Sequence, residues 1–436
     1  MKTIITDGKS EFDFLKEMKK RSGEISLSTN EAVMAIINEV KENGDEAVRK
    51  FGLRFDGAVP ETFEITEEEI IKAYEEAPED FKKALNHAKD NITAYHEKQI
   101  RKGYELKKDD GIVLGQMIRG LSKVGIYVPG GTAAYPSTVL MNTIPARLAG
   151  VEEVIMITPP MIEKENGCKP VCKANPDILA AAYIAGVDRV FLAGGAQSIA
   201  ALTFGTESFP AVDKIVGPGN IFVATAKKLL FGQVDIDMIA GPSEILVLAD
   251  EKANPKYIAA DLMSQAEHDK MASAVLLTTS EKIAEAAKKE IEQQMKLLNR
   301  NAIIEQSLTG FGAIIICKTM NEMILLANQI APEHLELMAQ NPMDYLPEIR
   351  NAGSVFCGEY APEPLGDYLS GTNHVLPTSG TARFSSPLGV DSFLKKISYT
   401  YYTREALAKD KDDIVIIAEK EGLDAHANSI KVRFEK

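Results

Sequence analysis

The stretch DLMSQAEHDK, residues 261–270, places a glutamine and a histidine three positions apart, at Gln265 and His268. The surrounding pattern is helical, and in a helix this spacing puts both side chains on one face, about one turn apart. An amide oxygen and an imidazole nitrogen can both bind a metal ion, but two ligands do not hold it tightly. The neighbouring residues offer no third ligand, so the rest of such a site must come from elsewhere in the chain.

A glutamate and a histidine are adjacent at Glu333 and His334, within the motif APEHLEL. The proline of this motif ends the preceding apolar helix, so we expect His334 to open a strand. Successive strand residues point to opposite faces, but at the end of a strand both side chains can reach one pocket. A carboxylate beside an imidazole suits general acid–base chemistry near neutral pH.

Two further segments combine a histidine with a carboxylate. Residues 359–384 are rich in glycine and proline and hold Asp367 and His374. A loop of this length in a compact domain is usually functional. The motif EGLDAHANS, further along the chain, holds Glu421 and His426.

A donor set for a divalent transition metal can be assembled from these segments. It contains two imidazoles, one carboxylate and one amide oxygen, which suits Zn²⁺, with Mn²⁺ or Co²⁺ as alternatives. With neutral histidines and an ionised aspartate, the centre would keep a net charge of about +1 and could anchor a nitrogen- or oxygen-bearing substrate. Spacing alone does not require these distant residues to converge. The four ligands of this set are Gln265, His268, Asp367 and His426.

Glycine-rich loops stand where parallel strands are expected to end. In open parallel sheets, ligands bind outside the carboxyl ends of the strands, where backbone N–H groups face an anion. No G-x-G-x-x-G motif is present, because Phe222 stands where the third glycine would follow Gly217 and Gly219. Four such loops in one domain favour a nucleotide or another phosphate-bearing ligand over a structural role. The loops are VPGGTAAYPS (128–137), LAGGAQS (192–198), VGPGN (216–220) and IAGPSE (239–244).

The elements that must position these residues alternate in type. Apolar runs such as KVGIYV, DRVFLA and SEILVLAD alternate with amphipathic segments from about residue 120 onwards. This alternation is typical of parallel βαβ units whose strands are buried on both faces. We therefore predict an α/β fold with two doubly wound, Rossmann-like but incomplete parallel-sheet domains, a helical N-terminal segment and a C-terminal extension, with no further sheet beyond about Ser392.

The predicted domains are discontinuous. Residues 1–24 form an N-terminal segment, residues 25–125 and 245–390 form the first α/β domain, and residues 126–244 form an inserted α/β domain that carries the glycine loops. Residues 391–436 form the C-terminal extension.

Composition excludes several classes of protein. The chain has 436 residues, 45% of them hydrophobic and 26% charged, and a net charge of −14. This acidic balance gives no general attraction for nucleic acid or anionic membranes. No apolar run of eighteen or more residues and no signal-peptide pattern is present, so we expect a cytoplasmic protein.

The remaining histidines and the cysteines are expected to be structural. His87 and His96 lie among charged residues of a helical segment, where a solvated face is the expected setting. Cys168 and Cys172 have a metal-like spacing but lack a second cysteine or histidine pair, so free thiols in a reducing compartment are expected. The other two cysteines, Cys317 and Cys357, follow apolar runs and are expected to pack as small hydrophobes.

Taken together, these motifs resemble those of the histidinol dehydrogenase family. The resemblance covers residues 25–434 and rests on long motifs in a fixed order. They are VGIYVPGGTAAYPSTVLMNTIPA, VGPGNIFVATAK, GPSEILV, SQAEHD, APEHLEL, GDYLSGTNHVLPTSGTARF and EGLDAHANS.

The resemblance implies an NAD-dependent, four-electron oxidation of L-histidinol to L-histidine through L-histidinaldehyde, the last step of histidine biosynthesis. It implies that Zn²⁺ is bound by the four ligands named above and that Glu333 and His334 are the acid–base pair. Substrate binding would involve Ser243, His374 and Glu421 together with the ligands and His334. It further implies an intertwined homodimer in which the C-terminal extension completes the partner's site. The positions matching NAD contacts are Tyr127, Gln197 and Asn220.

Three alternatives stay open at this point. A paralogue could oxidise another small alcohol such as a sulfonated diol, although Glu421 and His374 would suit an anionic sulfonate poorly. A metal-dependent hydrolase could use the Glu–His pair and zinc, but it would leave the glycine loops unexplained. A non-catalytic binding protein could have kept these residues without turnover.

Overall fold

Two six-stranded sheets, here called sheet A and sheet B, organise the computed structural model, which describes residues 1–21, 26–130, 134–163 and 170–435. Both sheets belong to one unit, residues 1–99 with 121–393, and residues 100–120 with 394–436 form a second unit. Sheet A is parallel throughout. Its strands, in spatial order, are β1 (Lys2–Ile5), β14 (Ala313–Ile316), β13 (Ser273–Thr278), β12 (Glu244–Ala249), β15 (His334–Met338) and β16 (Ser354–Cys357).

The central strands of sheet A are buried on both faces. Every residue of β12, β13 and β15 is buried, as continuous apolar runs such as EILVLA predict for parallel strands covered on both sides. Alternate residues enter opposite cores: Ile245 and Val247 pack in one apolar cluster, Leu246 and Leu248 in the other. The first cluster takes residues from α9 (Pro255–Ala266), α10 (Glu281–Gln294) and α11 (Asn301–Phe311), the second from α1 (Ser10–Arg21) and α12 (Met320–Ile330).

Sheet B is parallel except for one antiparallel edge strand, β2. Its strands, in spatial order, are β11 (Asp235–Ile236), β10 (Lys214–Val216), β5 (Lys123–Tyr127), β6 (Glu153–Thr158), β9 (Arg189–Leu192) and β2 (Glu64–Ile65). The helices of this region are α2 (Leu27–Phe55), α3 (Glu67–Glu76), α4 (Glu79–His96), α5 (Pro136–Leu148), α6 (Pro176–Ala185), α7 (Gly195–Phe204) and α8 (Ile221–Leu230). Helix α2 packs on α7 and α8, α3 on α6, and α4 on α5 and α6.

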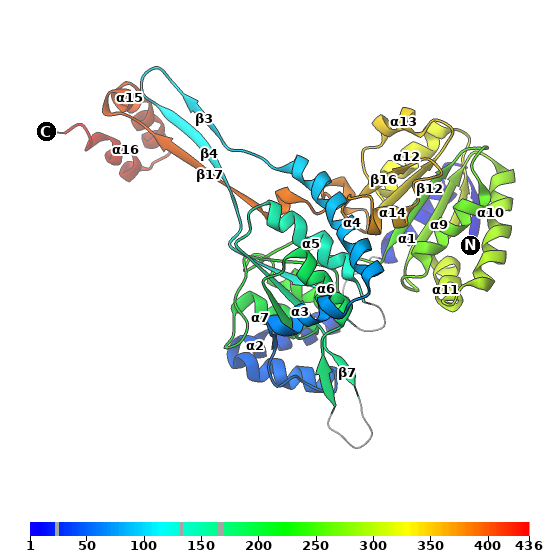
Figure 1. Cartoon of the computed structure of the whole chain (residues 1–436). Coiled ribbons are helices and arrows are strands. Elements are labelled where there is room, and N and C mark those ends of the chain that lie inside the picture. Colours follow the sequence, from blue (N-terminus) through cyan, green and yellow to red (C-terminus); the bar gives the residue numbers. More distant parts are fainter. Residues whose placement is uncertain (22–25, 131–133, 164–169, 436) are drawn as a thin grey trace. The chain divides into compact units, whose positions relative to one another are not determined.

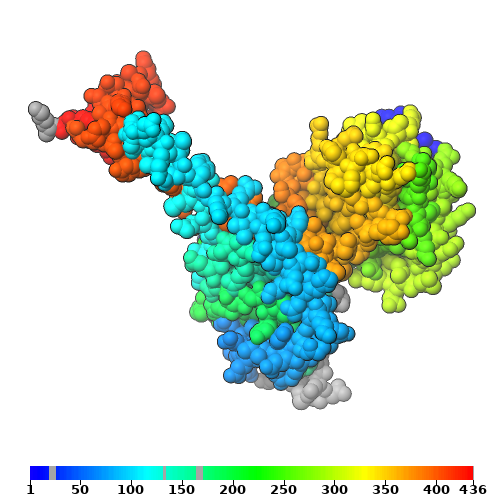
Figure 2. Space-filling view, turned by 45° about the horizontal axis from the view of Figure 1, so that its top comes forward, coloured from blue at the N-terminus to red at the C-terminus, as the bar shows by residue number. Residues whose placement is uncertain are grey.

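The early helices lie with a different sheet from the one that we expected. The sequence groups residues 25–125 with the strands of sheet A, whereas α2, α3 and α4 pack on helices of sheet B (Figure 1). Residues 2–5 instead supply β1 at the edge of sheet A, so the blue N-terminal residues lie among the green and yellow surface of that sheet's region in Figure 2. An amphipathic pattern reveals an apolar face but not the sheet that it meets. The remaining domain boundaries stay a prediction.

The second unit contains a three-stranded antiparallel sheet, β17 (Leu394–Tyr401), β4 (Val113–Gly120) and β3 (Tyr104–Lys107), and the helices α15 (Arg404–Lys420) and α16 (Asp424–Lys431). The expectation of no sheet beyond about Ser392 was therefore wrong. No residue of β17 is fully buried, so no apolar alternation marks this strand in the sequence.

The predicted α/β class with two parallel-sheet domains is confirmed. Within the described residues, no helix combines the length and the apolar character needed to cross a membrane. Cys172, in the hairpin of β7 (Met161–Glu163) and β8 (Val171–Lys173), is a free thiol, as are Cys317 and Cys357. Cys168 lies outside the described residues.

One predicted histidine setting was wrong. His87 is exposed, but His96 is fully buried, because it continues the apolar stripe of α4 formed by Leu85, Ala88 and Ile92. The spacing of that apolar stripe in the sequence, rather than the charged neighbours, indicates that His96 is buried.

Candidate active site and metal site

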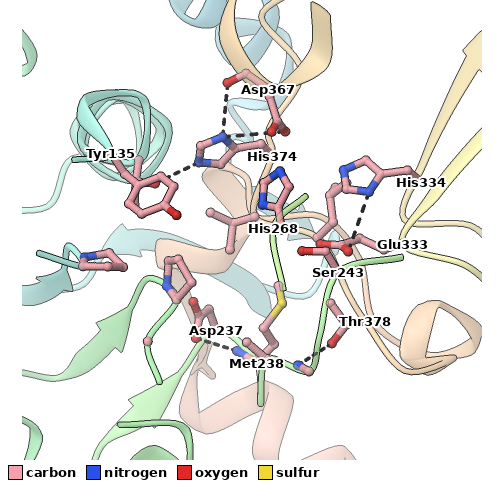
Figure 3. Close-up of a pocket in the computed structure, with 18 of the residues that line it drawn as sticks. Tyr135, Asp237, Met238, Ser243, His268, Glu333, His334, Asp367, His374 and Thr378 are labelled. Atoms are coloured by element: carbon pink, nitrogen blue, oxygen red, sulfur yellow. Dashed lines mark hydrogen bonds and ion pairs between the residues drawn. The ribbon is translucent and has the colours of Figure 1, made fainter. Parts of the chain in front are cut away.

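A cavity of about 270 Å³, here called the first cavity, joins the two sheets' edges within the larger unit. From sheet A it takes Ser243, Glu333 and His334, which stand at the amino ends of β12 and β15. From sheet B it takes Pro129, which follows β5, and Gly219, which follows β10. Figure 3 shows the labelled imidazoles and carboxylates converging on this space.

The Glu333–His334 pair is held by the neighbouring strand. The Glu333 carboxylate accepts the backbone N–H of Glu244 at 2.9 Å, and His334 Nδ1 lies 3.0 Å from the Glu244 carbonyl oxygen. A carbonyl only accepts hydrogen bonds, so Nδ1 is the donor and carries the hydrogen. His334 Nε2 is buried and has no hydrogen-bond partner among the described residues, and its lone pair is therefore available to accept a proton.

Burial shifts both groups of this pair towards their neutral forms. Removal from water, with the Glu244 charge as the next cause, raises the pKa of Glu333 well above its usual value. Burial likewise lowers the pKa of His334, and it lowers the pKa of His374 to about 4. Perturbed titratable groups that gather in a cavity are typical of catalytic sites.

Buried carboxylates gather at the first cavity. Burial and then the nearby Glu363 carboxylate raise the pKa of Asp367 to about 9. The described residues that line the cavity include Glu333 and Asp367 but no lysine or arginine, and a third acid of the lining, Asp237, is already paired with the buried Lys227. Such a surplus of acidic groups fits the binding of a positive ion.

Gln265 supports a metal site directly. Its side chain is 1% exposed, and neither its amide oxygen nor its amide nitrogen has a hydrogen-bond partner among the described residues. A buried amide without partners is costly, and a metal ion at its oxygen would remove the deficit. Asp367, on the short helix α14 (Glu363–Tyr368), lines the same cavity.

We expected His268 to lie in the same helix as Gln265. It lies instead in the turn that follows that helix. Helix α9 ends at Ala266, and the backbone N–H of His268 donates to the Gln265 carbonyl oxygen at 3.2 Å. This bond continues the helical path, so both side chains still line the first cavity. In Figure 3 the His268 ring lies between those of His374 and His334.

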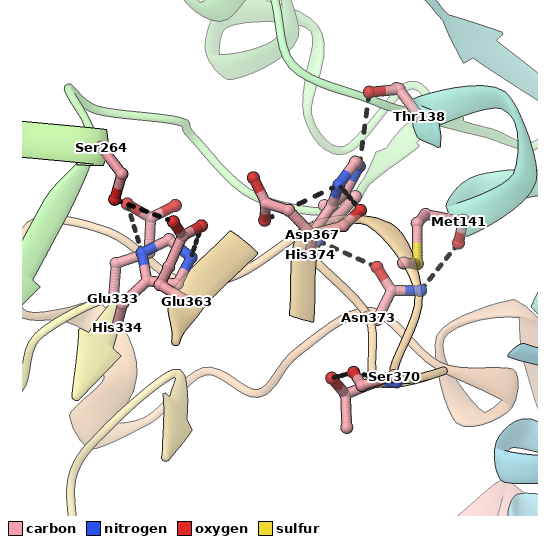
Figure 4. Close-up of polar contacts among 12 residues, drawn as sticks. Thr138, Met141, Ser264, Glu333, His334, Glu363, Asp367, Ser370, Asn373 and His374 are labelled. Carbon is pink, nitrogen blue, oxygen red and sulfur yellow. Dashed lines mark hydrogen bonds and ion pairs between the residues drawn. The ribbon is translucent and has the colours of Figure 1, made fainter. Parts of the chain in front are cut away.

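Sequence analysis missed Glu363. Ligand atoms of His334, Glu363 and Asp367 lie within 4.8 Å of one another, the one such group among the described histidines, cysteines and acids. Glu363 is 1% exposed, and its Oε1 lies 3.6 Å from His334 Nε2 (Figure 4). Its backbone N–H donates to Glu336 at 2.9 Å. The available signal was its spacing of four residues from Asp367, one helical turn.

His374 is fixed between the two sheets' regions. Its Nδ1 lies 3.1 Å from the Asp367 carbonyl oxygen, and its Nε2 lies 3.3 Å from the hydroxyl of Thr138 in α5. The preceding residue, Asn373, donates to the carbonyl oxygen of Met141 at 2.7 Å (Figure 4). The loop between α14 and β17 is therefore attached to α5, and it presents His374 to the first cavity.

The three residues predicted to contact NAD line another cavity of about 390 Å³, here called the second cavity. Tyr127 ends β5, Gln197 lies in the first turn of α7, and Asn220 caps α8. Gln197 is 2% exposed, and its Oε1 has no partner among the described residues. Burial raises the pKa of Tyr127 to about 12. Pro129 lines both cavities, so the two adjoin.

Glu421 and His426 belong to the second unit. Glu421 caps the C-terminal end of α15, and His426 lies in α16. They are described with that unit alone. All the other predicted site residues line one of the two cavities.

A family model described as histidinol dehydrogenase matches residues 19–434. The chain belongs to the histidinol dehydrogenase family. It is 55% identical over 433 residues to histidinol dehydrogenase of Clostridium acetobutylicum, covering 99% of both chains. It is 54% identical over 425 residues to that of Listeria monocytogenes, covering 97% of both. Its structure matches the crystal structure of histidinol dehydrogenase from Elizabethkingia anophelis with a TM-score of 0.91 and 37% identity, over 99% of this chain and 98% of that one.

Membership of the histidinol dehydrogenase family confirms the resemblance found in the sequence and makes the chain an oxidoreductase. The His–Glu–Asp cluster and the unpartnered Gln265 amide fit a metal cofactor in such an enzyme. A metal-dependent hydrolase, the alternative from another class, is disfavoured.

Proposed function

We propose that the protein is a cytoplasmic, zinc-dependent L-histidinol:NAD⁺ oxidoreductase. It oxidises L-histidinol to L-histidine through L-histidinaldehyde with two NAD⁺ reduced, the last step of L-histidine biosynthesis. The observation that carries this proposal is the pair of adjoining cavities that share Pro129. One holds an acid–base pair with metal-ligand side chains, and the other holds the three residues that match NAD contacts.

One zinc ion per subunit would be held by Gln265, His268, Asp367 and His426. The unpartnered amide of Gln265 and the excess of carboxylates over cations support this assignment for the three ligands of the larger unit. When bound, zinc would hold a nitrogen of the substrate and fix the reacting carbon, while each NAD⁺ would accept one hydride.

The acid–base pair would move the protons. His334 Nε2, whose lone pair is free, takes the proton of the substrate hydroxyl in the first oxidation. Glu333 then deprotonates the water that attacks the aldehyde carbon. A carboxylate with a raised pKa is the stronger base once ionised, which suits this second role.

Substrate recognition would combine Ser243 and His374, from the larger unit, with Glu421. A carboxylate at position 421 suits the imidazole N–H of histidinol. The family resemblance supports an intertwined homodimer in which Glu421 and His426 complete the site of the other subunit. Each active site would then be built from two chains.

The test is the number of NADH molecules formed per L-histidinol consumed, before and after removal of metal with a chelator and readdition of Zn²⁺. We expect two NADH per substrate, lost with the metal and restored by zinc. Bound metal, measured by atomic absorption, should fall to well below one ion per subunit in Gln265→Ala. One NADH per substrate, or none with zinc bound, would contradict the proposed reaction.

A further inference from the structure

Asp56 places a single carboxylate in the second cavity. It follows α2 as its C-terminal cap, and its backbone N–H is already bonded to the Gly52 carbonyl oxygen. Its side chain lines the cavity together with Tyr127, Gln197 and Asn220. Burial is the cause of its raised pKa, with no hydrogen bond or nearby charge from the described residues contributing to that shift. The proposed reaction assigns this carboxylate no role.

The electrostatics of the second cavity are one-sided. The described residues that line it include no lysine, arginine or histidine, and Asp56 is the one ionisable group besides the Tyr127 phenol. Asp56 also stands at the C-terminal end of a helix, which carries a partial negative charge. A second anion placed beside Asp56 would therefore meet repulsion from both.

The geometry decides which half of the cofactor meets Asp56. Hydride transfer takes place at the substrate carbon beside His334, so the nicotinamide end must reach the first cavity. The two cavities adjoin at Pro129, and this leaves the adenosine end for the second cavity.

Other features of the second cavity fit that end. The N-terminal end of α7 has no side-chain cap and lies at the cavity through Gly194 and Gly195, which suits a pyrophosphate. The Gly195 N–H donates to the hydroxyl of Tyr127 at 3.4 Å, so both of these residues lie at the same end of α7. The exposed rings of Phe55 and Phe222 also line the cavity and suit an adenine.

Given the proposed function, we propose that the Asp56 carboxylate accepts hydrogen bonds from the hydroxyls of the adenosine ribose and thereby makes the enzyme select NAD over NADP. A ribose diol offers two donors to an acceptor-only carboxylate. The 2′-phosphate of NADP removes one donor and adds an anion in a cavity that has no described cation.

Arg54 offers a second substitution that tests this selectivity. Its guanidinium carbon lies 5.3 Å from the centre of the Phe55 ring, and Arg54 does not line the cavity. With the charge of Asp56 removed, Arg54 is the cation on this helix end that can attract a 2′-phosphate.

The experiment measures kcat/KM with NAD and with NADP for L-histidinol oxidation by full-length enzyme. Asp56→Asn should raise KM for NAD about tenfold with kcat within about twofold, and raise the NADP-to-NAD ratio of kcat/KM by about tenfold or more. Combining Arg54→Ala with Asp56→Asn should return kcat/KM with NADP towards the value of the unaltered enzyme. Glu42→Gln, at an exposed position of the same helix, removes an equal charge and should change neither KM for NAD nor the NADP-to-NAD ratio of kcat/KM. An unchanged ratio in Asp56→Asn would overturn the proposal.

Calorimetric titration with ADP-ribose and with its 2′-phosphate separates this inference from the proposed function, because it needs no turnover. We expect the unaltered protein to bind ADP-ribose more tightly than ADP-ribose 2′-phosphate. In Asp56→Asn the ratio of the two dissociation constants should be smaller. If the unaltered protein oxidises L-histidinol with NAD but Asp56→Asn binds both ligands as before, only the role of Asp56 fails. If it binds neither ligand and forms no NADH, the cofactor assignment and the proposed function fail together.

Discussion

The edges that sheet A and sheet B present to the two adjoining cavities differ in both direction and chemistry. Sheet A contributes the amino ends of its strands, where Glu333 and His334 are buried and their pKa values are shifted. Sheet B contributes carboxyl ends followed by glycine loops, with amides such as Gln197 and Asn220 beside them. The acid–base pair thus stands at the end of a buried strand, while the backbone of the glycine loops is of the kind that suits a phosphate-bearing cofactor. Similar sheets serve both purposes because opposite ends are used.

The largest effect is expected at the sheet A edge. Glu333→Ala removes the proposed base for the attacking water, and kcat with L-histidinol should fall by about 10³-fold while KM for NAD changes little. Steady-state kinetics with a melting curve as the check on folding measure this. A rise in KM for NAD equal to the loss in kcat would show that the two edges are not functionally separate.

A mixed dimer sharpens the same comparison. If His426 completes the partner's site, heterodimers of Glu333→Ala with His426→Ala contain one site free of both substitutions and should recover partial activity. The matched control is a heterodimer of Glu333→Ala with Glu333→Ala,His426→Ala, which has no such site. No recovery in verified heterodimers would contradict a shared site.

A smaller effect is expected at the sheet B edge. Gly195 has φ +68°, and a Cβ there would lie 2.7 Å from Gln197 Oε1. Gly195→Ala should therefore raise KM for NAD about tenfold, with kcat within about threefold. Gly186→Ala is the control, because Gly186 also has a positive φ, +82°, but a Cβ there meets nothing within 4 Å. Equal changes in KM for both variants would attribute the effect to backbone strain alone.

The smallest effect concerns the contact between α4 and the loop that carries His374. His96 Nδ1 donates to Gln99 at 2.9 Å, and Nε2 accepts from Asn373 at 3.4 Å, an arrangement that suits the neutral ring. Burial lowers the pKa of His96 below 6.5, so the unfolded chain binds the proton more readily than the folded one. Stability should rise with pH through this range and be lost as the pH falls below about 6.5.

Replacing His96 with glutamine should therefore flatten the dependence of the free energy of unfolding on pH between about 7 and 5. Denaturant unfolding at several pH values measures this. His87→Gln, at an exposed position of the same helix, should keep the original slope. An unchanged slope in His96→Gln would assign the dependence to other groups.

The fold class was predictable because parallel strands buried on both faces leave continuous apolar runs, as in β12 and β13. Strand β17 left no such trace, since it has no fully buried residue. The partner of an amphipathic helix is equally hidden, and this is why α2–α4 were grouped with the wrong strands.

The site was predictable only in part. Local sequence indicated the Glu333–His334 pair and the loop that holds Asp367 and His374. Family resemblance alone indicated the three positions that match NAD contacts. Glu363 escaped because nothing in EYAPEPLGDY shows that this carboxylate is buried against His334. Asp56 was not identified either, because a charged residue after a helix is common, and only the structure shows the cavity beside this one.

The pairing of β1 with β14 also has a consequence for the order of events during synthesis. Residues 2–5 emerge first, but their partner, residues 313–316, is made about 300 residues later, which takes about 15–60 seconds at usual translation speeds. The strands and helices of sheet B span residues 27–236 and can assemble in the meantime. The first strand to be translated is thus among the last to pair, and its backbone hydrogen-bonding groups have no strand partner in sheet A until residues 313–316 are made.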